Sequence, residues 1–124
     1  MMDKEYVMHI AATIQQQLLT TTHMPVLMSW GIEEFAAVLF EDKPALRIAV
    51  HARLFQGYVV ICLNAADYYE VFLLNGQDVK RLHDEVCFDE LGEVIDRAIE
   101  SGADKEEYER FCARQAEGLF GQHA

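Results

Sequence analysis

The sequence YYEVFLLNGQDVKRL, from Tyr68 to Leu82, carries the strongest local structural signal in this chain of 124 residues. A run rich in aromatic, β-branched and aliphatic residues precedes Asn75-Gly76, and a run in which Val79 and Leu82 stand among polar residues follows it. A type I′ turn needs a positive φ at both central residues, and Asn and Gly adopt that conformation readily. The stretch therefore predicts a β-hairpin with strands at 68–74 and 77–83.

Short apolar runs with a period of two continue upstream of this hairpin. They predict further strands at 25–30, 34–40, 45–54 and 58–63. The separators are Gly31, the run from Glu41 to Pro44, Gln56-Gly57 and the run from Asn64 to Asp67. None of these connections is long enough for a parallel crossover. We therefore expect an antiparallel meander of five or six strands.

Helical periodicity frames this sheet at both ends of the chain. Residues 3–22 carry an apolar stripe of Val7, Ile10, Ala11, Ile14 and Leu18. A second stripe consists of Leu91, Val94, Ile95, Ala98 and Ile99, and Ser101-Gly102 ends it. A last helix begins at Asp104, has Tyr108, Phe111 and Cys112 on its apolar side, and frays near Gly118 and Gly121.

These patterns predict an α+β fold. It has an N-terminal helix, the antiparallel meander, and two acidic C-terminal helices that pack back on the sheet. The length leaves little room for two independent cores, so we expect one domain over residues 1–124.

The charge is strongly negative and concentrated in one region. The chain has 10 Lys and Arg against 21 Asp and Glu, a formal net charge of −11. Between Asp84 and Glu109 lie eleven acids and two bases, which is the opposite of a phosphate-backbone binder. We expect no direct nucleic-acid binding. The acids expected to point outward are Glu90, Glu93, Asp96, Glu100 and Glu107.

Several features favour a cytoplasmic protein without a bound metal or cofactor. No apolar run approaches the roughly 20 residues of a membrane span, and the N-terminus mixes charges where a signal peptide would not. Cys62, Cys87 and Cys112 are an odd number without CxxC spacing. They are predicted to be buried free thiols.

Threading the hairpins assigns the strand residues to two faces. If Leu54 opposes Tyr58, Leu63 opposes Tyr68 and Leu74 opposes Gln77, strict alternation decides the rest. The predicted floor for the helices is Leu46, Ile48, Val50, Ala52, Leu54, Val60, Cys62, Val71 and Leu73. The predicted opposite face has an apolar centre of Val59, Ile61, Leu63, Phe72, Leu74 and Val79. Its charged rim is Arg47, His51, Arg53, Glu70, Arg81 and His83, with Glu70 directly opposite Arg81.

An apolar centre with a charged rim is typical of a protein interface. This pattern thus favours a homo-oligomer or a surface for a protein partner on this face. The alternative is that a helix covers the face, or that a one-residue register slip has exchanged the two faces.

Catalytic signatures are sparse. The sequence contains no nucleophile elbow, metalloprotease motif, phosphate loop or dinucleotide fingerprint. His51 and His83 could meet across the sheet beside Asp84 and form a metal or acid–base site. Met8, Met24 and Met28 are interpreted as core filler.

Three segments carry a resemblance to known proteins: Trp30-Gly31 after an apolar run, the run from Asp67 to Leu74, and the passage from Val86 to Asp96. In them the chain resembles small uncharacterised accessory proteins of bacterial phages and conjugative elements. The resemblance implies a bacterial cytoplasmic protein and carries over no functional residue. In size and acidity the chain is also similar to type III secretion chaperones, which place a helix where residues 64–67 leave no room for one.

The leading functional hypothesis is a non-enzymatic binding or adaptor protein of a bacterial mobile element. It would self-associate or bind an unknown protein partner, through a sheet face or the acidic helices, and bind no membrane. One alternative is an acidic nucleic-acid mimic or an inhibitor of a basic protein. The other is a small hydrolase or metal-dependent enzyme that uses His51, His83 and Asp84.

Overall fold

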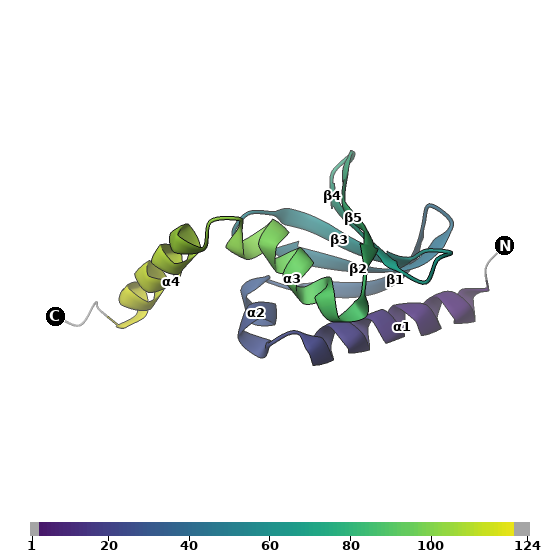
Figure 1. Ribbon diagram of the computed structural model, residues 1–124, viewed down its shortest axis with the longest axis horizontal. Helices are drawn as coiled ribbons and strands as arrows, with labels where there is room; N and C mark the ends of the chain where they lie inside the picture. The colour runs from purple at the N-terminus through teal and green to yellow at the C-terminus, as the bar shows by residue number, and fades with distance from the viewer. Residues whose placement is uncertain (1–2, 121–124) are drawn as a thin grey trace.

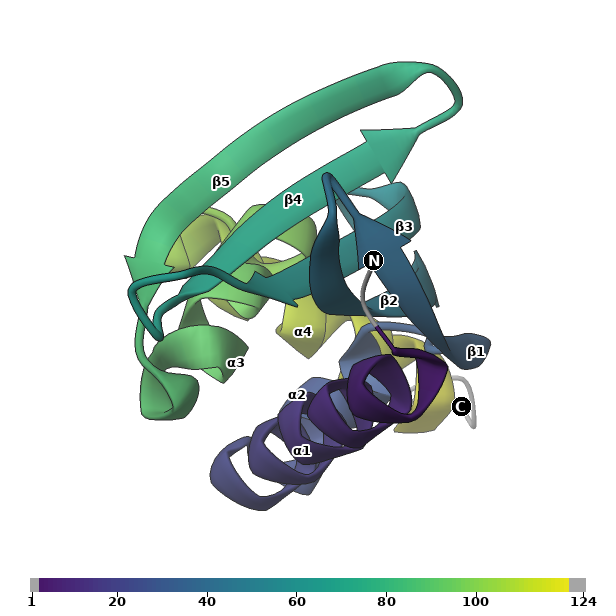
Figure 2. The ribbon, with the colours of Figure 1, turned by 90° about the vertical axis from the view of Figure 1, so that its right-hand side faces the viewer.

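The computed structural model describes residues 3–120 and has the α+β architecture that the sequence predicts. A five-stranded antiparallel sheet in the order β1-β2-β3-β4-β5 carries helices α1, α2 and α3 on one side (Figure 1 and Figure 2). Helix α4 extends from the body at the opposite end from the N-terminus (Figure 1). No described helix combines the length and the apolar character needed to cross a membrane.

Helix α1 (Lys4–Thr21) follows its predicted apolar stripe. Asp3 caps it, because its side chain accepts a hydrogen bond from the Glu5 N–H at 3.2 Å. Four residues spaced three or four apart are buried: Val7, Ala11, Ile14 and Leu18. The last three belong to the main core.

The predicted strand at 25–30 is wrong. These residues form a short helix, α2 (Met24–Ser29). Pro25 lies in its first turn, where a missing N–H costs no hydrogen bond. The exposure follows a helical period, with Leu27 and Trp30 buried and Met24 and Met28 facing solvent.

The sheet is a sequential meander. Its strands are β1 (Glu34–Phe40), β2 (Lys43–His51), β3 (Gln56–Leu63), β4 (Tyr69–Asn75) and β5 (Asp78–Val86). Strand β1 has the predicted bounds, whereas β2 begins two residues earlier and ends three residues earlier than expected. Glu41 and Asp42, both with positive φ, form the turn between β1 and β2.

The predicted register is wrong in the β2–β3, β3–β4 and β4–β5 hairpins. His51 pairs with Gln56, so Ala52 to Phe55 form the loop and Leu54 does not oppose Tyr58. Leu63 pairs with Tyr69, because the Asn64 side chain accepts the N–H groups of Ala66 and Tyr68 and holds a longer loop. The last turn lies at Gly76-Gln77, one residue beyond Asn75-Gly76, with positive φ on Gly76 only.

Because of these shifts, the side chains of β3 lie on the opposite faces of the sheet from those predicted. The face under the helices carries Leu46, Ile48, Val50, Val59, Ile61, Tyr69, Val71 and Leu73. The opposite face has its own small core of Ala45, Val60, Cys62 and Phe72. The rings of Phe40 and Phe72 lie 4.7 Å apart although strands β2 and β3 separate them. Neighbouring strands are about 4.8 Å apart, so the sheet must curl, and we call this opposite side the concave face.

The C-terminal part agrees with the sequence in its helices and differs in their packing. A 3₁₀ turn (η1, Phe88–Glu90) leads into α3 (Leu91–Asp96), which continues as a π-helical turn (η2, Arg97–Ser101). Gly102, at a φ of 76°, ends it as predicted. Leu91, Ile95 and Ile99 join the main core.

The prediction that the last helix packs back on the sheet is wrong. Helix α4 (Lys105–Phe120) extends away from the sheet (Figure 1). The Asp104 carboxylate accepts the Glu107 N–H at 3.1 Å and caps its start. Gly118 lies within the helix instead of in a frayed tail, and Gly121 lies outside the described residues.

Candidate binding surfaces

The predicted interface on the sheet is divided between its two faces. Val59, Ile61 and Leu63 pack under the helices, because β3 is turned over, so they cannot form a surface. Five of the predicted residues lie together on the concave face or at its edge: Phe72, Leu74, Val79, Arg47 and Arg81. The floor residues Val60 and Cys62 belong to this face as well. Exposed Leu54 and half-buried Ala52 lie in the loop after β2.

Charged side chains cover the small core of the concave face. The Arg47 guanidinium lies 4.5 Å from the centre of the Tyr58 ring, and that of Arg81 lies 5.4 Å from the Phe72 ring. In cation–π contacts of this kind the guanidinium is attracted to the face of the ring. The concave face is therefore a polar layer over an apolar floor, rather than the open apolar centre that the sequence predicts.

Glu70 is the central charge of this face and is 8% exposed. Its carboxylate lies 3.4 Å from Lys43 Nζ and 3.9 Å from an Arg81 nitrogen, and it accepts an N–H of Asn64 at 3.2 Å. The pair with Arg81 is diagonal, since Arg81 stands opposite Phe72 and not opposite Glu70 as predicted. Partial desolvation lowers the pKa of Lys43, but the attraction to Glu70, with smaller contributions from Cys62 and Glu41, outweighs it and the pKa is raised. Glu70 therefore ties β2, β4 and β5 together.

The cysteines are free thiols, as predicted, but only Cys62 is buried; Cys87 and Cys112 are exposed. Burial, and then the nearby Glu70 carboxylate, raise the pKa of Cys62 to about 11. The reactive species is the thiolate. Pulse alkylation at pH 8, followed by mass spectrometry, is expected to label Cys112 within minutes and Cys62 about 100-fold more slowly. Equal labelling, or a mass lower by two hydrogens under non-reducing conditions, would contradict this arrangement.

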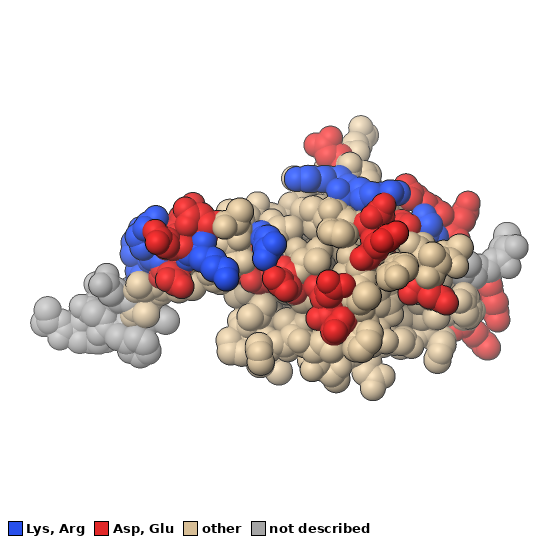
Figure 3. Space-filling model, in the orientation of Figure 1, with Lys and Arg blue, Asp and Glu red and all other residues tan. Residues whose placement is uncertain are grey.

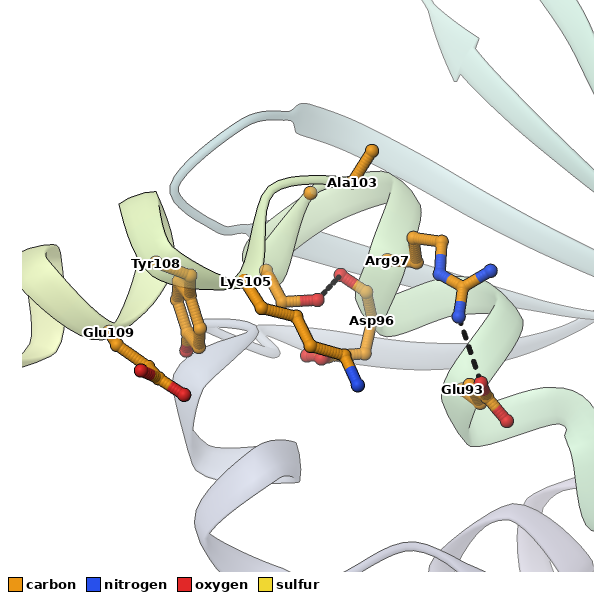
Figure 4. A pocket seen from close by; sticks show the side chains of 9 residues that line it. Glu93, Asp96, Arg97, Ala103, Lys105, Tyr108 and Glu109 are labelled. Carbon is orange, nitrogen blue, oxygen red and sulfur yellow. Dashed lines mark hydrogen bonds and ion pairs between the residues drawn. The ribbon is translucent and has the colours of Figure 1, made fainter.

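The acidic helices present less free negative charge than the sequence suggests. Of the five predicted outward acids, Glu90, Glu93 and Glu107 are exposed, Asp96 is half-buried and Glu100 is 4% exposed. On the face in Figure 3, basic and acidic atoms alternate over α4. A hollow of about 400 Å³ between α3 and α4 likewise mixes Arg97 and Lys105 with the acids, and Figure 4 shows the Arg97–Glu93 ion pair at 2.9 Å.

Added salt is expected to raise the melting temperature between low and moderate ionic strength. The net charge is −11, and exposed like charges repel over a Debye length of about 10 Å at 0.1 M salt. Differential scanning calorimetry in 10 to 200 mM NaCl measures the effect. A melting temperature that falls with salt would mean that ion pairs such as Arg97–Glu93 outweigh the repulsion.

Glu100 is buried and forms hydrogen bonds with Arg53, a residue that the sequence places on the charged rim of the sheet. Its carboxylate accepts the Arg53 backbone N–H at 2.9 Å, and Arg53 Nε donates to the Glu100 carbonyl at 2.9 Å. A second guanidinium nitrogen donates to the Ser101 carbonyl at 3.2 Å. The cation thus lies at the C-terminal end of a helix, where it is favoured.

The same guanidinium reaches α4. It lies 5.3 and 5.1 Å from the centres of the Tyr108 and Phe111 rings and 3.5 Å from the Glu107 carboxylate. Burial, and then the Glu100 carboxylate, raise the pKa of the Tyr108 hydroxyl. Arg53 therefore fixes the first two turns of α4 to the body.

The proposed catalytic set of His51, His83 and Asp84 is not assembled. His51 pairs with Gln56 at the end of β2, whereas the cross-strand row of His83 runs through Val71 and meets β2 at Leu46. Among the described residues, one group is close enough to hold a metal ion: the exposed Cys87, Asp89 and Glu90. The Glu90 carboxylate accepts the Cys87 N–H at 3.1 Å, so this group caps the helical turn that follows.

An apolar surface lies around α2, where the sequence predicts a strand. A groove of about 430 Å³ is lined by Leu19, Met24, Leu27, Met28, Gly31, Ile32 and Phe35. Met24 is 65% and Met28 is 75% exposed, so their interpretation as core filler is wrong; Met8, on α1, is also exposed.

One signal in the sequence marks this surface. From Tyr6 to Ile32 the chain has no Lys, Arg, Asp or Glu, although the whole chain is 25% charged. In Figure 3 the surface over α2 is accordingly free of acidic and basic side chains.

Comparison with known proteins gives no match: no family model, no curated protein and no solved structure is significantly similar to this chain. The resemblance to bacterial accessory proteins therefore stays a prediction.

Proposed function

We propose that the protein is a non-enzymatic binding protein that self-associates and holds an apolar segment of another protein in the α2 groove. The observation that carries this proposal is the exposure of Met24 and Met28 within a surface free of charged side chains. Contiguous apolar surface is uncommon on a soluble monomer, and it marks interaction sites. Methionine side chains adapt to ligands of different shape.

The surroundings of the groove suggest the chemistry of the partner. Exposed Glu33 and Glu34 follow Ile32 at one end of the groove, and the whole chain carries a charge of −11. A partner segment with apolar side chains flanked by Lys or Arg would bury its apolar part in the groove. Its basic residues would be attracted electrostatically.

The test is a double variant, Met24→Gln with Met28→Gln, compared with Met8→Gln. Burial of a Met side chain is worth about 1.5 to 3 kcal/mol, so loss of both should weaken capture of a partner more than tenfold. Met8, which is 54% exposed and lies outside the groove, tests for a general loss of surface hydrophobicity.

Immobilised wild type, double variant and control are incubated with lysate of the source organism, and the retained proteins are quantified by mass spectrometry. We expect a partner that wild type and Met8→Gln retain and the double variant loses. Equal retention by all three proteins would contradict the proposed groove.

A further inference from the structure

Helix α4 has an apolar side that its own chain leaves largely uncovered. Its first two turns are held by Arg53, but beyond Phe111 the residues Cys112, Gln115 and Ala116 on the same side are exposed. This side of α4 forms one wall of a groove of about 580 Å³. The body supplies the other wall, which includes Ser29, His51 and Ala52.

The charges along α4 are divided between its two halves. Residues 104–109 carry four acids and one lysine, whereas residues 110–117 carry two arginines and one glutamate. Two copies of α4 that run antiparallel therefore set the acidic first half of each against the basic second half of the other. A parallel pair would place like charges side by side.

We infer that α4 pairs antiparallel with the α4 of a second copy of this chain, about a two-fold axis near Phe111, and that each α4 occupies the groove of the other protomer. A two-fold interface needs one surface that is complementary to itself. The apolar side of α4 meets this condition, because it is both a wall of the groove and the segment that fills it. This inference rests on the proposed self-association and names the surface that performs it.

The first experiment measures the dimer dissociation constant by sedimentation velocity for wild type, Phe111→Glu and Ala113→Glu. Phe111 lines the groove, whereas Ala113, two residues away on the helix, does not. The expected result is a dimeric wild type, a dissociation constant raised at least about tenfold by Phe111→Glu, and little change in Ala113→Glu. Circular dichroism checks that both variants are folded.

The second experiment uses the exposed cysteines and does not disturb the helix. In a Cys87→Ser variant, a short bis-maleimide can react only with Cys112 among exposed thiols, since Cys62 is buried. Because Cys112 lies close to the proposed axis, we expect a covalent dimer, and we expect none in Cys112→Ser, which retains Cys87.

The two proposals fail in different ways. A wild type that is dimeric, with neither a Cys112 cross-link nor an effect of Phe111→Glu, would overturn α4 pairing and leave self-association through another surface. A monomeric wild type at millimolar concentration would overturn α4 pairing together with the proposed self-association. Binding of an unrelated helix in the groove of such a monomer would likewise contradict the pairing of two α4 helices.

Discussion

The Trp30→Ala variant is expected to lose about 3 to 5 kcal/mol of the free energy of unfolding, the usual cost of removing a buried Trp. Trp30 is fully buried between the end of α2 and the sheet, in the main core. Its Nε1–H donates to the Asp96 carboxylate at 2.9 Å, so it also joins α2 to α3. Urea unfolding followed by circular dichroism measures the loss, because the chain has one Trp and the variant has no Trp fluorescence.

The matched variant Trp30→Phe separates packing from the hydrogen bond. It keeps most of the apolar contact and removes the bond to the half-buried Asp96 carboxylate. Hydrogen bonds to charged groups contribute about 1.5 to 3 kcal/mol. We therefore expect Phe to destabilise clearly less than Ala. A loss below 1 kcal/mol in Trp30→Ala would mean that this residue does not connect the elements as described.

Gly31→Ala is the second substitution with a large expected effect, about 3 kcal/mol or more. Gly31 has a φ of +60°, and a Cβ there would collide with the backbone carbonyl oxygen of His51. The His51 N–H in turn donates to the carbonyls of Trp30 and Gly31 at 3.1 and 3.0 Å. Since the new Cβ is held rigidly by its own backbone and the atoms that it meets are backbone atoms of His51, relief requires that α2 move away from β2.

Gly76→Ala is the control for this second prediction. Gly76 has nearly the same φ, +61°, but nothing lies within 4 Å of a Cβ at that position. Its substitution should therefore cost only the left-handed strain of about 1 to 2 kcal/mol. Equal losses in the two variants would show that backbone strain alone, and no collision, explains the effect at Gly31.

Local sequence signals predicted the elements well where period and end signals agree. The stripe of α1, the bounds of β1 and the stop at Gly102 are all confirmed. Helix α2 was missed because six residues are too few to distinguish a period of two from one of 3.6. The sequence signal that favours this helix is Pro25, because proline suits a first helical turn.

The strand register was not predictable, because the turns depend on contacts beyond the turn residues. A loop at Ala52 to Phe55 replaces the expected Gln56-Gly57 turn, since Leu54 N–H bonds to the carbonyl of Ile99 at 2.8 Å, far away in the sequence. A shift by an odd number of residues turns every side chain of a strand to the other face. This is why the predicted interface lost Val59, Ile61 and Leu63 to the core.

The candidate sites depend on long-range pairs in the same way. In the sequence, Glu100 does not differ from the other acids of the C-terminal helices. It is buried because Arg53, which lies in the β2–β3 loop, forms hydrogen bonds with it. Charge counts could not reveal this pairing. In contrast, the absence of charged residues between Tyr6 and Ile32 is a direct sequence signal for the uncharged surface over α2.

The sequential order of the strands leaves the sheet with two edges, β1 and β5, that differ in their protection against pairing with other chains. Edge strand β5 carries five exposed charged residues: Asp78, Lys80, Arg81, Asp84 and Glu85. Charges on an edge strand discourage edge-to-edge aggregation. The other edge, β1, has one charged residue, Glu34, followed by Phe-Ala-Ala-Val-Leu-Phe without Gly or Pro. Such a segment is a template for cross-β stacking. Colloidal stability of this protein thus depends on β1 far more than on β5.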